Sequence, residues 1–341
     1  MTSNSLLSLL RSPRVVMAAK LLVFVIVAFF IGRAVVKAFD QMQAEGVTLA
    51  SLNLWWLCLA GGLFLVAQIP LAWFWRQAMW QLGQHPSWSR TLYAYYLGSL
   101  GKYVPGKAMV VVLRTGFVRG PQVDPIIAAL CVFIETLTMM AAGGFLGAVL
   151  VLVLVRFTGL PIGETWLVYP LAIGLMLATG IPTIPPIFRF VAKVLRISRA
   201  KADVNELLER LDYRLMAQGW LANLVAWPIM GLSLWSALKA MPETEHALGS
   251  PWQQLPLLTA SIALAVVAGF VSMLPGGVGV RELVLNLLMT PTFGRLAIVS
   301  IILLRLAWLM AEVAFSSILY VSGKLMPQAP TPESEGSADS T

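Results

Sequence analysis

Long apolar runs dominate this sequence and constrain its fold more than any other feature. Hydrophobic residues make up 58% of the 341 residues and charged residues only 12%, whereas soluble domains carry about 25% charged residues. A membrane-crossing helix needs about 20 apolar residues. The sequence therefore predicts an all-α integral membrane protein, a polytopic bundle of about seven or eight transmembrane helices. We expect one membrane domain over residues 1–325 and a disordered tail over residues 326–341.

Seven apolar runs are expected to form helices in the membrane: Leu21–Gly32, Leu52–Trp75, Ile126–Val155, Trp166–Ile184, Leu215–Leu238, Leu255–Leu274 and Leu296–Val321. A basic amino terminus before a short apolar run is also typical of a signal peptide. No clean small-x-small cleavage site follows, because Arg33 separates Gly32 from Ala34, so we expect an uncleaved first span.

Charge between the runs predicts which side each connector faces. The connector over residues 189–214 is rich in Lys and Arg, and residues 188–196 have the spacing of an interfacial helix or belong to a solvated loop. Cytoplasmic segments carry an excess of Lys and Arg, so we expect this connector and the amino terminus on the cytoplasmic side of the cell membrane. The loop with Glu243, Glu245 and His246 is expected to face outward.

Two segments, Ser99–Lys107 and Ser272–Glu282, interrupt the apolar pattern with helix-breaking residues beside fixed charge. Such breaks are tolerated at membrane depth only where the backbone is buried in protein or lines a cavity. After each break a helical apolar pattern resumes that is too short to cross, so we expect two re-entrant half-helices. The residues that shape the breaks are Gly101, Pro105, Gly106, Pro275, Gly276, Gly277 and Gly279.

Cations stand beside both expected half-helix starts, where unpaired backbone N–H groups and the helix dipole favour an anion. Lys102, Lys107 and Arg114 accompany the first break, and Arg281 the second. This combination predicts a binding site for a lipid phosphate. Two ordinary turns whose cations anchor the protein to anionic lipid would leave the same pattern.

Three charged residues lie deep in apolar runs, where an unpaired charge is costly: Glu135, Arg305 and Glu312. We expect Arg305 to meet an anionic headgroup partway across the membrane. Glu135 is its expected partner when the site is empty, since Glu312 lies about two helical turns from Arg305. A buried pair that only fixes helix packing remains the alternative.

Other ligand types find little support in the sequence. Cys58 and Cys131 lie within apolar runs, and His85 and His246 lie far apart without a second ligand at metal spacing. We therefore expect no metal, no other cofactor and no nucleic-acid partner.

The two interrupted segments, Gly101–Lys107 and Leu274–Glu282, resemble in order and separation the signatures of the lysylphosphatidylglycerol synthetase transmembrane-region family, which are flippase-like membrane proteins. The resemblance covers nearly the whole chain. It implies a helical bundle with re-entrant elements that moves or presents anionic or polyprenyl-linked lipids across the cytoplasmic membrane. Full lysyltransferases carry a large soluble catalytic domain after this region, whereas this sequence ends shortly after its last span. We expect that it does not make lysyl-lipid itself.

Together these features predict flippase-like translocation of an anionic phospholipid or a polyprenyl-phosphate lipid. A membrane-embedded glycosyltransferase is one alternative, and an accessory partner of a glycosyltransferase or lipid-modifying enzyme is another. Such an enzyme needs a catalytic carboxylate on an external loop. The loop near Asp40 and Glu45 is short and lacks paired acids, so we expect no enzymatic activity.

Overall fold

The computed structural model describes residues 49–104, 108–121, 123–159, 165–194, 209–244, 248–272, 277 and 279–325, with scattered positions between 25 and 46. Within these residues the fold is helical and contains no β-strand. The α-helices are α3 (Leu54–Gln81), α4 (Trp88–Ser99), α5 (Ala108–Val118), α6 (Pro125–Thr158), α7 (Thr165–Gly180), α8 (Pro185–Val194), α10 (Tyr213–Lys239), α11 (Pro251–Val271), α12 (Val280–Phe293) and α13 (Leu296–Leu325). Short 3-10 turns are η1 (Leu49–Ser51), η2 (Leu100–Tyr103), η3 (Ile181–Thr183) and η5 (Pro242–Thr244).

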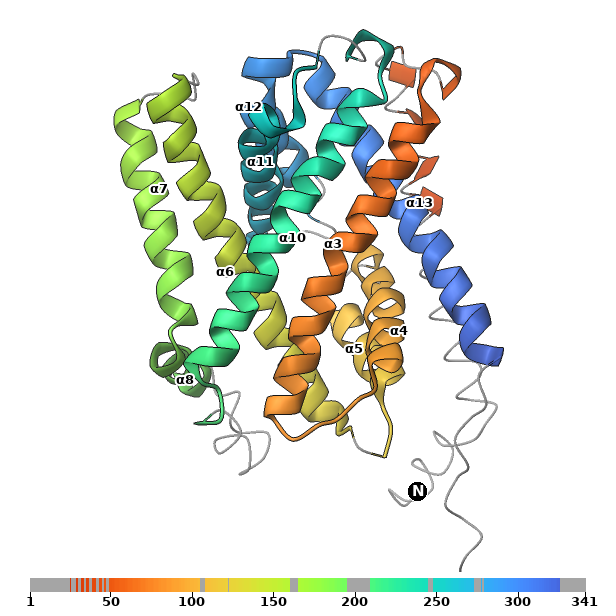
Figure 1. The fold of residues 1–341 in the computed structure, drawn as a ribbon, viewed down its shortest axis with the longest axis vertical. Helices are drawn as coiled ribbons and strands as arrows, with labels where there is room; N and C mark the ends of the chain where they lie inside the picture. Colours follow the sequence, from red (N-terminus) through yellow and green to blue (C-terminus); the bar gives the residue numbers. More distant parts are fainter. Residues whose placement is uncertain are drawn as a thin grey trace, which may run out of the picture.

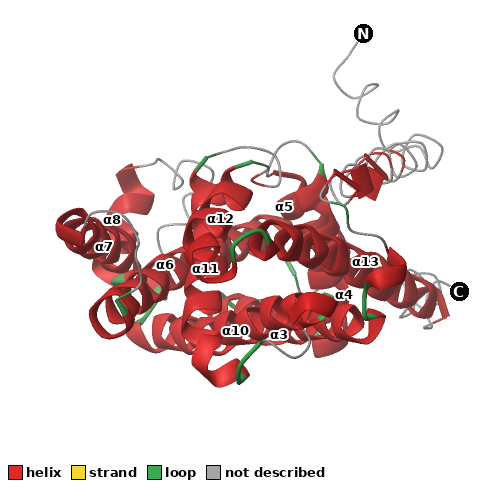
Figure 2. Ribbon diagram, turned by 90° about the horizontal axis from the view of Figure 1, so that it is seen from above, coloured by secondary structure: helices red, strands yellow, loops and turns green. Residues whose placement is uncertain are grey.

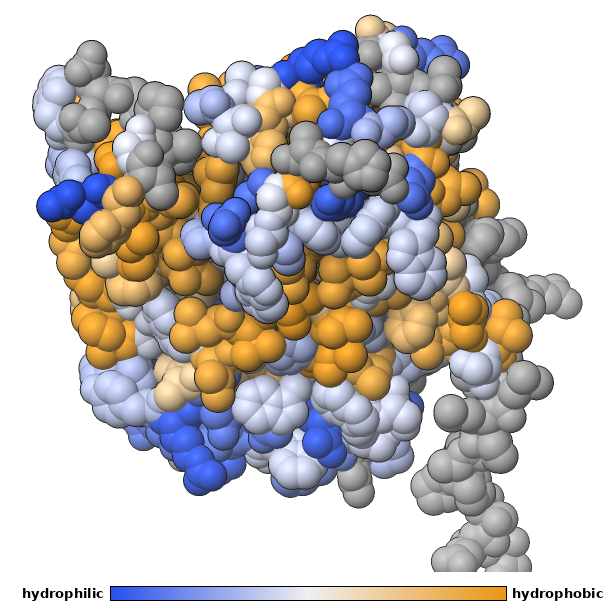
Figure 3. Space-filling model, turned by 45° about the horizontal axis from the view of Figure 1, so that its top comes forward, coloured by the Kyte–Doolittle hydropathy of each residue, from blue (hydrophilic) through white to orange (hydrophobic). Residues whose placement is uncertain are grey.

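The described helices form an all-α polytopic membrane protein. Six of them are long and apolar enough to cross a membrane: α3, α6, α7 continued by η3, α10, α11 and α13. Figure 3 shows the matching surface, an apolar band between hydrophilic residues gathered above and below it. Large apolar side chains on the outside of the bundle, such as Leu171 and Phe133, are therefore placed to face lipid.

Side-chain caps set where several helices begin. Asn53 accepts a hydrogen bond from the backbone N–H of Trp55 at the start of α3, and Asp212 accepts one from Leu215 at the start of α10. Asp124 caps α6, with Pro125 in the first turn, where a missing N–H costs nothing. These polar residues separate the apolar runs and fix the length of the helices that follow.

Two parts of the described chain, α3 to α6 and α10 to α13, have similar construction and opposite direction, and α7, η3 and α8 lie between them (Figure 1). We call these parts the two halves. In the first half, α3 descends, α4, η2 and α5 form a hairpin from the lower face, and α6 rises. In the second, α10 rises, α11 and α12 form a hairpin from the upper face, and α13 descends. We call α4–η2–α5 hairpin 1 and α11–α12 hairpin 2. The two halves are inverted-topology repeats, an arrangement common among secondary transporters.

Packing between the helices follows the same two-fold relation. The opening helices α3 and α10 contact each other, each hairpin contacts the last helix of its own half, and α4 contacts α13 as α11 contacts α6. Figure 2 shows α12 and α5 in one row beside a parallel row of α10 and α3. The hairpins thus enter one bundle from opposite faces and approach each other inside it.

The structure changes two expectations for the helices. The run that was expected to cross at 255–274 is the first arm of hairpin 2, and α12 returns the chain to the same face. The sequence left the side of the carboxyl end open, since seven spans would place it outside and eight inside. In the structure α13 ends on the face where α4 and α10 begin. The expected interfacial helix begins earlier, as α8 from Pro185, and lies at the lower face. The expected first span over 21–32 and the tail over 326–341 lie outside, or almost wholly outside, the described residues.

Candidate functional site

Polar side chains from both hairpins and α13 meet inside the bundle. The Lys102 ammonium of η2 lies 2.6 Å from Oε1 of Glu312 on α13, and the Tyr103 hydroxyl donates to Oε2 at 2.7 Å. Glu312 is buried, with 1% of its side chain exposed, whereas 33% of the Lys102 side chain is exposed. One carboxylate therefore holds the turn of hairpin 1 against the last helix of the other half.

Stacked aromatic rings pack against the Lys102 ammonium. Its ammonium lies 5.0 Å from the centre of the Phe64 ring, within cation–π range. Phe64 is itself stacked on Trp308 at 4.1 Å between ring centres, and the Trp308 indole N–H donates to Ser233. The rings keep α3, α10 and α13 in register beneath the charged groups.

A second ion pair joins Arg305 of α13 to Glu282 of α12. Glu282 also accepts a hydrogen bond from the backbone N–H of Gly279 at 2.7 Å, so it caps the helix that carries it. Both side chains are partly exposed. This pair holds hairpin 2 to the same face of α13 that receives hairpin 1.

Arg281 is the cation of this region that has no carboxylate partner among the described residues. Its side chain lies against two glycines, and a Cβ atom added to Gly269 would come within 2.6 Å of Arg281 Cγ. One added to Gly277 would come within 2.8 Å of Arg281 Nε, and Gly277 also has φ +66°. The Nε atom is buried without a hydrogen-bond partner in the described structure. Arg305, Tyr103 and Glu312 are close enough to interact with Arg281 electrostatically.

We define the central cluster as Lys102, Tyr103, Arg281, Glu282, Arg305 and Glu312. Three of these side chains are cations and two are carboxylates, so the central cluster has one excess positive charge. An excess positive charge away from bulk water is stabilised by an anion. The Nε atoms of Arg281 and Arg114 both lack a hydrogen-bond partner in the described structure, so the missing ion pair, and not the free donor, distinguishes Arg281.

In hairpin 1 the buried cation is neutralised by a carboxylate. Arg114 of α5 lies 2.8 Å from Glu135 of α6, which also accepts from the Tyr95 hydroxyl at 2.9 Å. The guanidinium is 3.8 Å from the Tyr95 ring centre and donates to Ser99. Side-chain exposure is 7% for Arg114 and 3% for Glu135. This buried pair offers no free charge to a ligand.

The structure brings together three of the predicted site residues, Lys102, Arg281 and Arg305. It places the other two described charged residues, Arg114 and Glu135, in the separate pair. The expectation that Glu135 partners Arg305 is wrong, because each has its own partner from the neighbouring hairpin. Lys107, Pro105, Gly106, Pro275 and Gly276 lie outside the described residues. Gly101 is described and close-packed, since an added Cβ would come within 2.7 Å of the Val110 nitrogen.

Sequence reasoning missed Tyr103 and Phe64 as site residues. Tyr103 lies within the first interrupted segment, so its place in the motif was a signal that could have found it. Phe64 looks like any other aromatic residue of an apolar run, and only the packing of α3 against α13 reveals its role.

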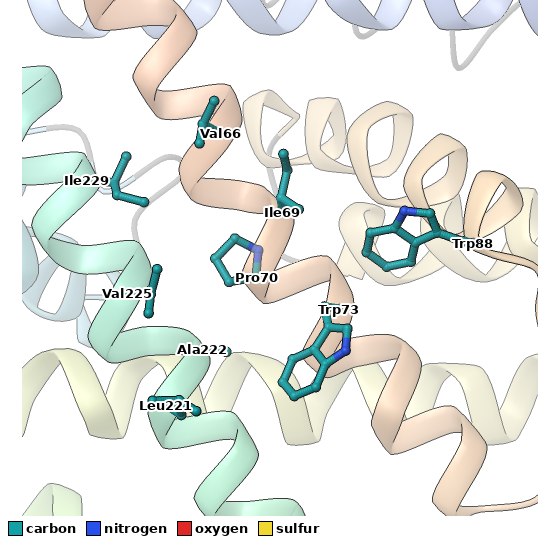
Figure 4. A pocket seen from close by; sticks show the side chains of 9 residues that line it. All are labelled: Val66, Ile69, Pro70, Trp73, Trp88, Leu221, Ala222, Val225 and Ile229. Carbon is teal, nitrogen blue, oxygen red and sulfur yellow. The ribbon is translucent and has the colours of Figure 1, made fainter.

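An apolar groove of about 500 Å³ lies between α3 and α10 (Figure 4). Pro70, Trp73 and Trp88 line it together with aliphatic side chains, and it lacks charged residues. Its chemistry is that of a surface against lipid chains, separate from the central cluster. In the described part of the chain, no group of three His, Cys, Asp or Glu side chains could hold a metal ion.

Fold and site together define a helical membrane protein with inverted repeats, two re-entrant hairpins and a positively charged centre. The chain belongs to the family described as the lysylphosphatidylglycerol synthase TM region, whose model matches residues 17–311. No curated protein matches the chain. The family is one of flippase-like, lipid-related membrane domains, in agreement with the resemblance of the two interrupted segments.

Proposed function

We propose that the protein translocates a lipid with an anionic headgroup, either a phospholipid or a polyprenyl-phosphate lipid, across the membrane. The observation that carries this proposal is Arg281, a cation without a carboxylate partner in the described structure, beside Arg305 and close to Lys102. A phosphate oxygen would supply the acceptor that the buried Nε lacks.

Comparison of the two halves strengthens this proposal. Glu135 lies about three turns into α6, and Arg305 lies about three turns into α13, the equivalent helix. Arg114 of hairpin 1 therefore faces a carboxylate, whereas Arg281 of hairpin 2 faces a second cation. At this position in the second half, no carboxylate among the described residues faces Arg281 in an ion pair, and the lipid phosphate would supply the anion.

In this proposal the headgroup occupies the central cluster while the acyl or prenyl chains remain in the bilayer. Hairpin 1 enters the bundle from one face and hairpin 2 from the other. Small movements of either hairpin would therefore expose the central cluster to one side of the membrane and then to the other. The protein acts as a transporter, alone or with a glycosyltransferase or lipid-modifying enzyme, and not as an enzyme itself.

We further propose that the protein lies in the cytoplasmic membrane. The face drawn at the bottom of Figure 1 and the amino terminus are then on the cytoplasmic side. Described cations gather at the lower ends of the helices, among them Arg76, Arg90, Arg119, Arg189 and Arg214. Fewer described cations lie at the upper ends of the helices: Arg156, Lys239 and Arg295, the last paired with Glu243. The excess of Arg at the lower face favours a cytoplasmic position.

Arg281→Gln tests the proposed function. The variant should slow the translocation of tail-labelled phosphatidylglycerol about tenfold or more, because a charge-assisted contact to phosphate contributes about 1.5–3 kcal/mol. Purified protein is reconstituted into phosphatidylcholine vesicles, and translocation is read from the labelled lipid protected against an impermeant quencher.

Arg295→Gln is the matched control, since it removes an exposed arginine whose side chain is 73% accessible. It should translocate lipid at the wild-type rate. Equal rates for wild-type protein and Arg281→Gln would contradict the proposed site. No protein-dependent translocation of phosphatidylglycerol or of a polyprenyl phosphate would contradict the function.

A further inference from the structure

Glu312 differs from the other buried carboxylates in what balances its charge. Both of its oxygens are held from the turn of hairpin 1, one by Lys102 at 2.6 Å and the other by the Tyr103 hydroxyl at 2.7 Å. The carboxylate is 1% exposed, but Lys102 is 33% exposed. The counter-ion of Glu312 is therefore within reach of a ligand, while Glu312 itself is not.

The other two carboxylates of the bundle interior lack this combination. Glu135 is paired with Arg114, and both are almost fully buried, so no ligand can take the cation away. Glu282 is 27% exposed and keeps its hydrogen bond to the Gly279 backbone when Arg305 is engaged elsewhere. Among these three, only Glu312 can lose its cation to a ligand and remain buried.

Few other charges face Glu312 from the helices around it. Tyr96 of α4 donates its hydroxyl to the Leu65 carbonyl, and Arg281 of α12 is the residue that we assign to the headgroup. The elements α3 and α10 carry their described ionisable side chains toward their ends: Cys58, Arg76, Tyr213, Arg214 and Lys239. Arg281 is the second described cation that interacts with Glu312, and in this proposal it is engaged by the headgroup as well.

We propose that headgroup binding and proton binding are coupled at Glu312. This inference rests on the proposed function. The phosphate takes the Lys102 ammonium, so the N–H contact to Glu312 breaks and one to a phosphate oxygen forms. Glu312 then takes one proton from water, and Tyr103 keeps its contact to the carboxyl group. An unpaired carboxylate in this buried position is unfavourable, and neutralisation by a proton removes the cost.

The proposed step fixes the ratio of protons to lipid molecules at one to one. The empty central cluster has one excess positive charge, and it has the same excess with a singly charged phosphodiester bound and Glu312 protonated. One proton therefore crosses with each lipid anion, and the transport cycle is electroneutral. A pH gradient would drive this cycle. A difference of one pH unit supports a ratio of about ten between the lipid concentrations of the two leaflets. The cycle does not respond to a membrane potential.

Proton uptake on lipid binding tests the coupling without requiring transport. Short-chain phosphatidylglycerol is added to purified protein in weakly buffered detergent at neutral pH, and the pH change is recorded beside the bound lipid. Wild-type protein should take up close to one proton per lipid bound. Glu312→Gln should bind the lipid with no uptake, because its carboxamide oxygen can accept from Lys102 and its NH2 can donate to the Tyr103 hydroxyl, but the group takes no proton.

Glu243→Gln is the control, because Glu243 is 54% exposed in a surface pair, and it should behave as wild type. If Glu312→Gln does not fold, Lys102→Met serves instead: the ammonium that a phosphate would take from Glu312 is absent, and proton uptake on binding should be lost. Wild-type protein that binds phosphatidylglycerol without proton uptake overturns the coupling and leaves the proposed function intact. Absence of binding overturns both.

Discussion

Arg114 and Arg281 each lie against a glycine in the first arm of their hairpin, Gly98 and Gly269, yet in the described structure only Arg114 is paired with a carboxylate. Glu135→Gln removes that carboxylate and should destabilise the protein by about 3–5 kcal/mol, because it leaves a buried guanidinium without an opposite charge. Stability is measured as the free energy of unfolding in mixed micelles during titration with denaturing detergent.

The double variant Arg114→Met with Glu135→Gln separates a packing role from a role in transport. Removing both charges should cost less than removing Glu135 alone, and lipid translocation should persist. Arg295→Gln, in an exposed pair, should change stability by no more than about 0.5 kcal/mol. A double variant that is stable but cannot translocate lipid would place Arg114 in the headgroup site.

At the residue scale, the sequence identified which charges matter but not how they pair. The cost of charge in an apolar run marks Glu135, Arg305 and Glu312 from their positions in the sequence alone. Their partners come from hairpins whose docking depends on tertiary packing, so a pairing inferred from separate helices was wrong. Arg305 and Glu312, about two turns apart on α13, are each paired with a residue of a different hairpin.

Hairpin 2 depends on the absence of a side chain at Gly269, where Arg281 crosses from α12 to α11. Gly269→Ala should push the Arg281 side chain aside, because the added Cβ lies 2.6 Å from Arg281 Cγ. Loss of a well-placed charge-assisted contact predicts about tenfold weaker binding of phosphatidylglycerol, although the charge itself is retained. Binding is measured by titration of purified protein with the short-chain lipid.

Gly174→Ala on α7 is the control for the cost of replacing a helical glycine, because an added Cβ has nothing within 4 Å. Its lipid affinity should match that of the wild type. If Gly269→Ala also binds lipid normally, the position of Arg281 against α11 is not required for headgroup binding.

At the scale of elements, helix breakers predicted the two half-helices, α5 and α12, but not the first arms that make them hairpins. The starts of α5 and α12 lie where an apolar pattern resumes after proline and glycine. The sequence did not reveal that α11 turns back. Its 21 residues are apolar enough to cross a membrane, and only the path of the chain after Val271 shows otherwise.

At the scale of the whole molecule, the inverted repeat escaped sequence analysis for a physical reason. The shared pattern is short, an aliphatic residue followed by Pro and Gly, as in Val104-Pro105-Gly106 and Leu274-Pro275-Gly276. The first arms of the hairpins differ in length, with 12 residues in α4 and 21 in α11. Similarity of helix order and contacts, rather than of residues, defines the two halves.

The inverted repeat places the bases of the two hairpins on opposite sides of the membrane. Ser89, at the base of hairpin 1, and Ser250, before hairpin 2, are both exposed. Single cysteines at these positions, with Cys58 and Cys131 changed to Ala, are treated with an impermeant thiol reagent. On intact cells Ser250→Cys should react and Ser89→Cys should react only after permeabilisation, because we propose that the arginine-rich lower face is cytoplasmic. The reverse pattern would invert the orientation, and reaction of both on intact cells would contradict the opposed hairpins, since a hairpin returns its chain to the face from which it entered.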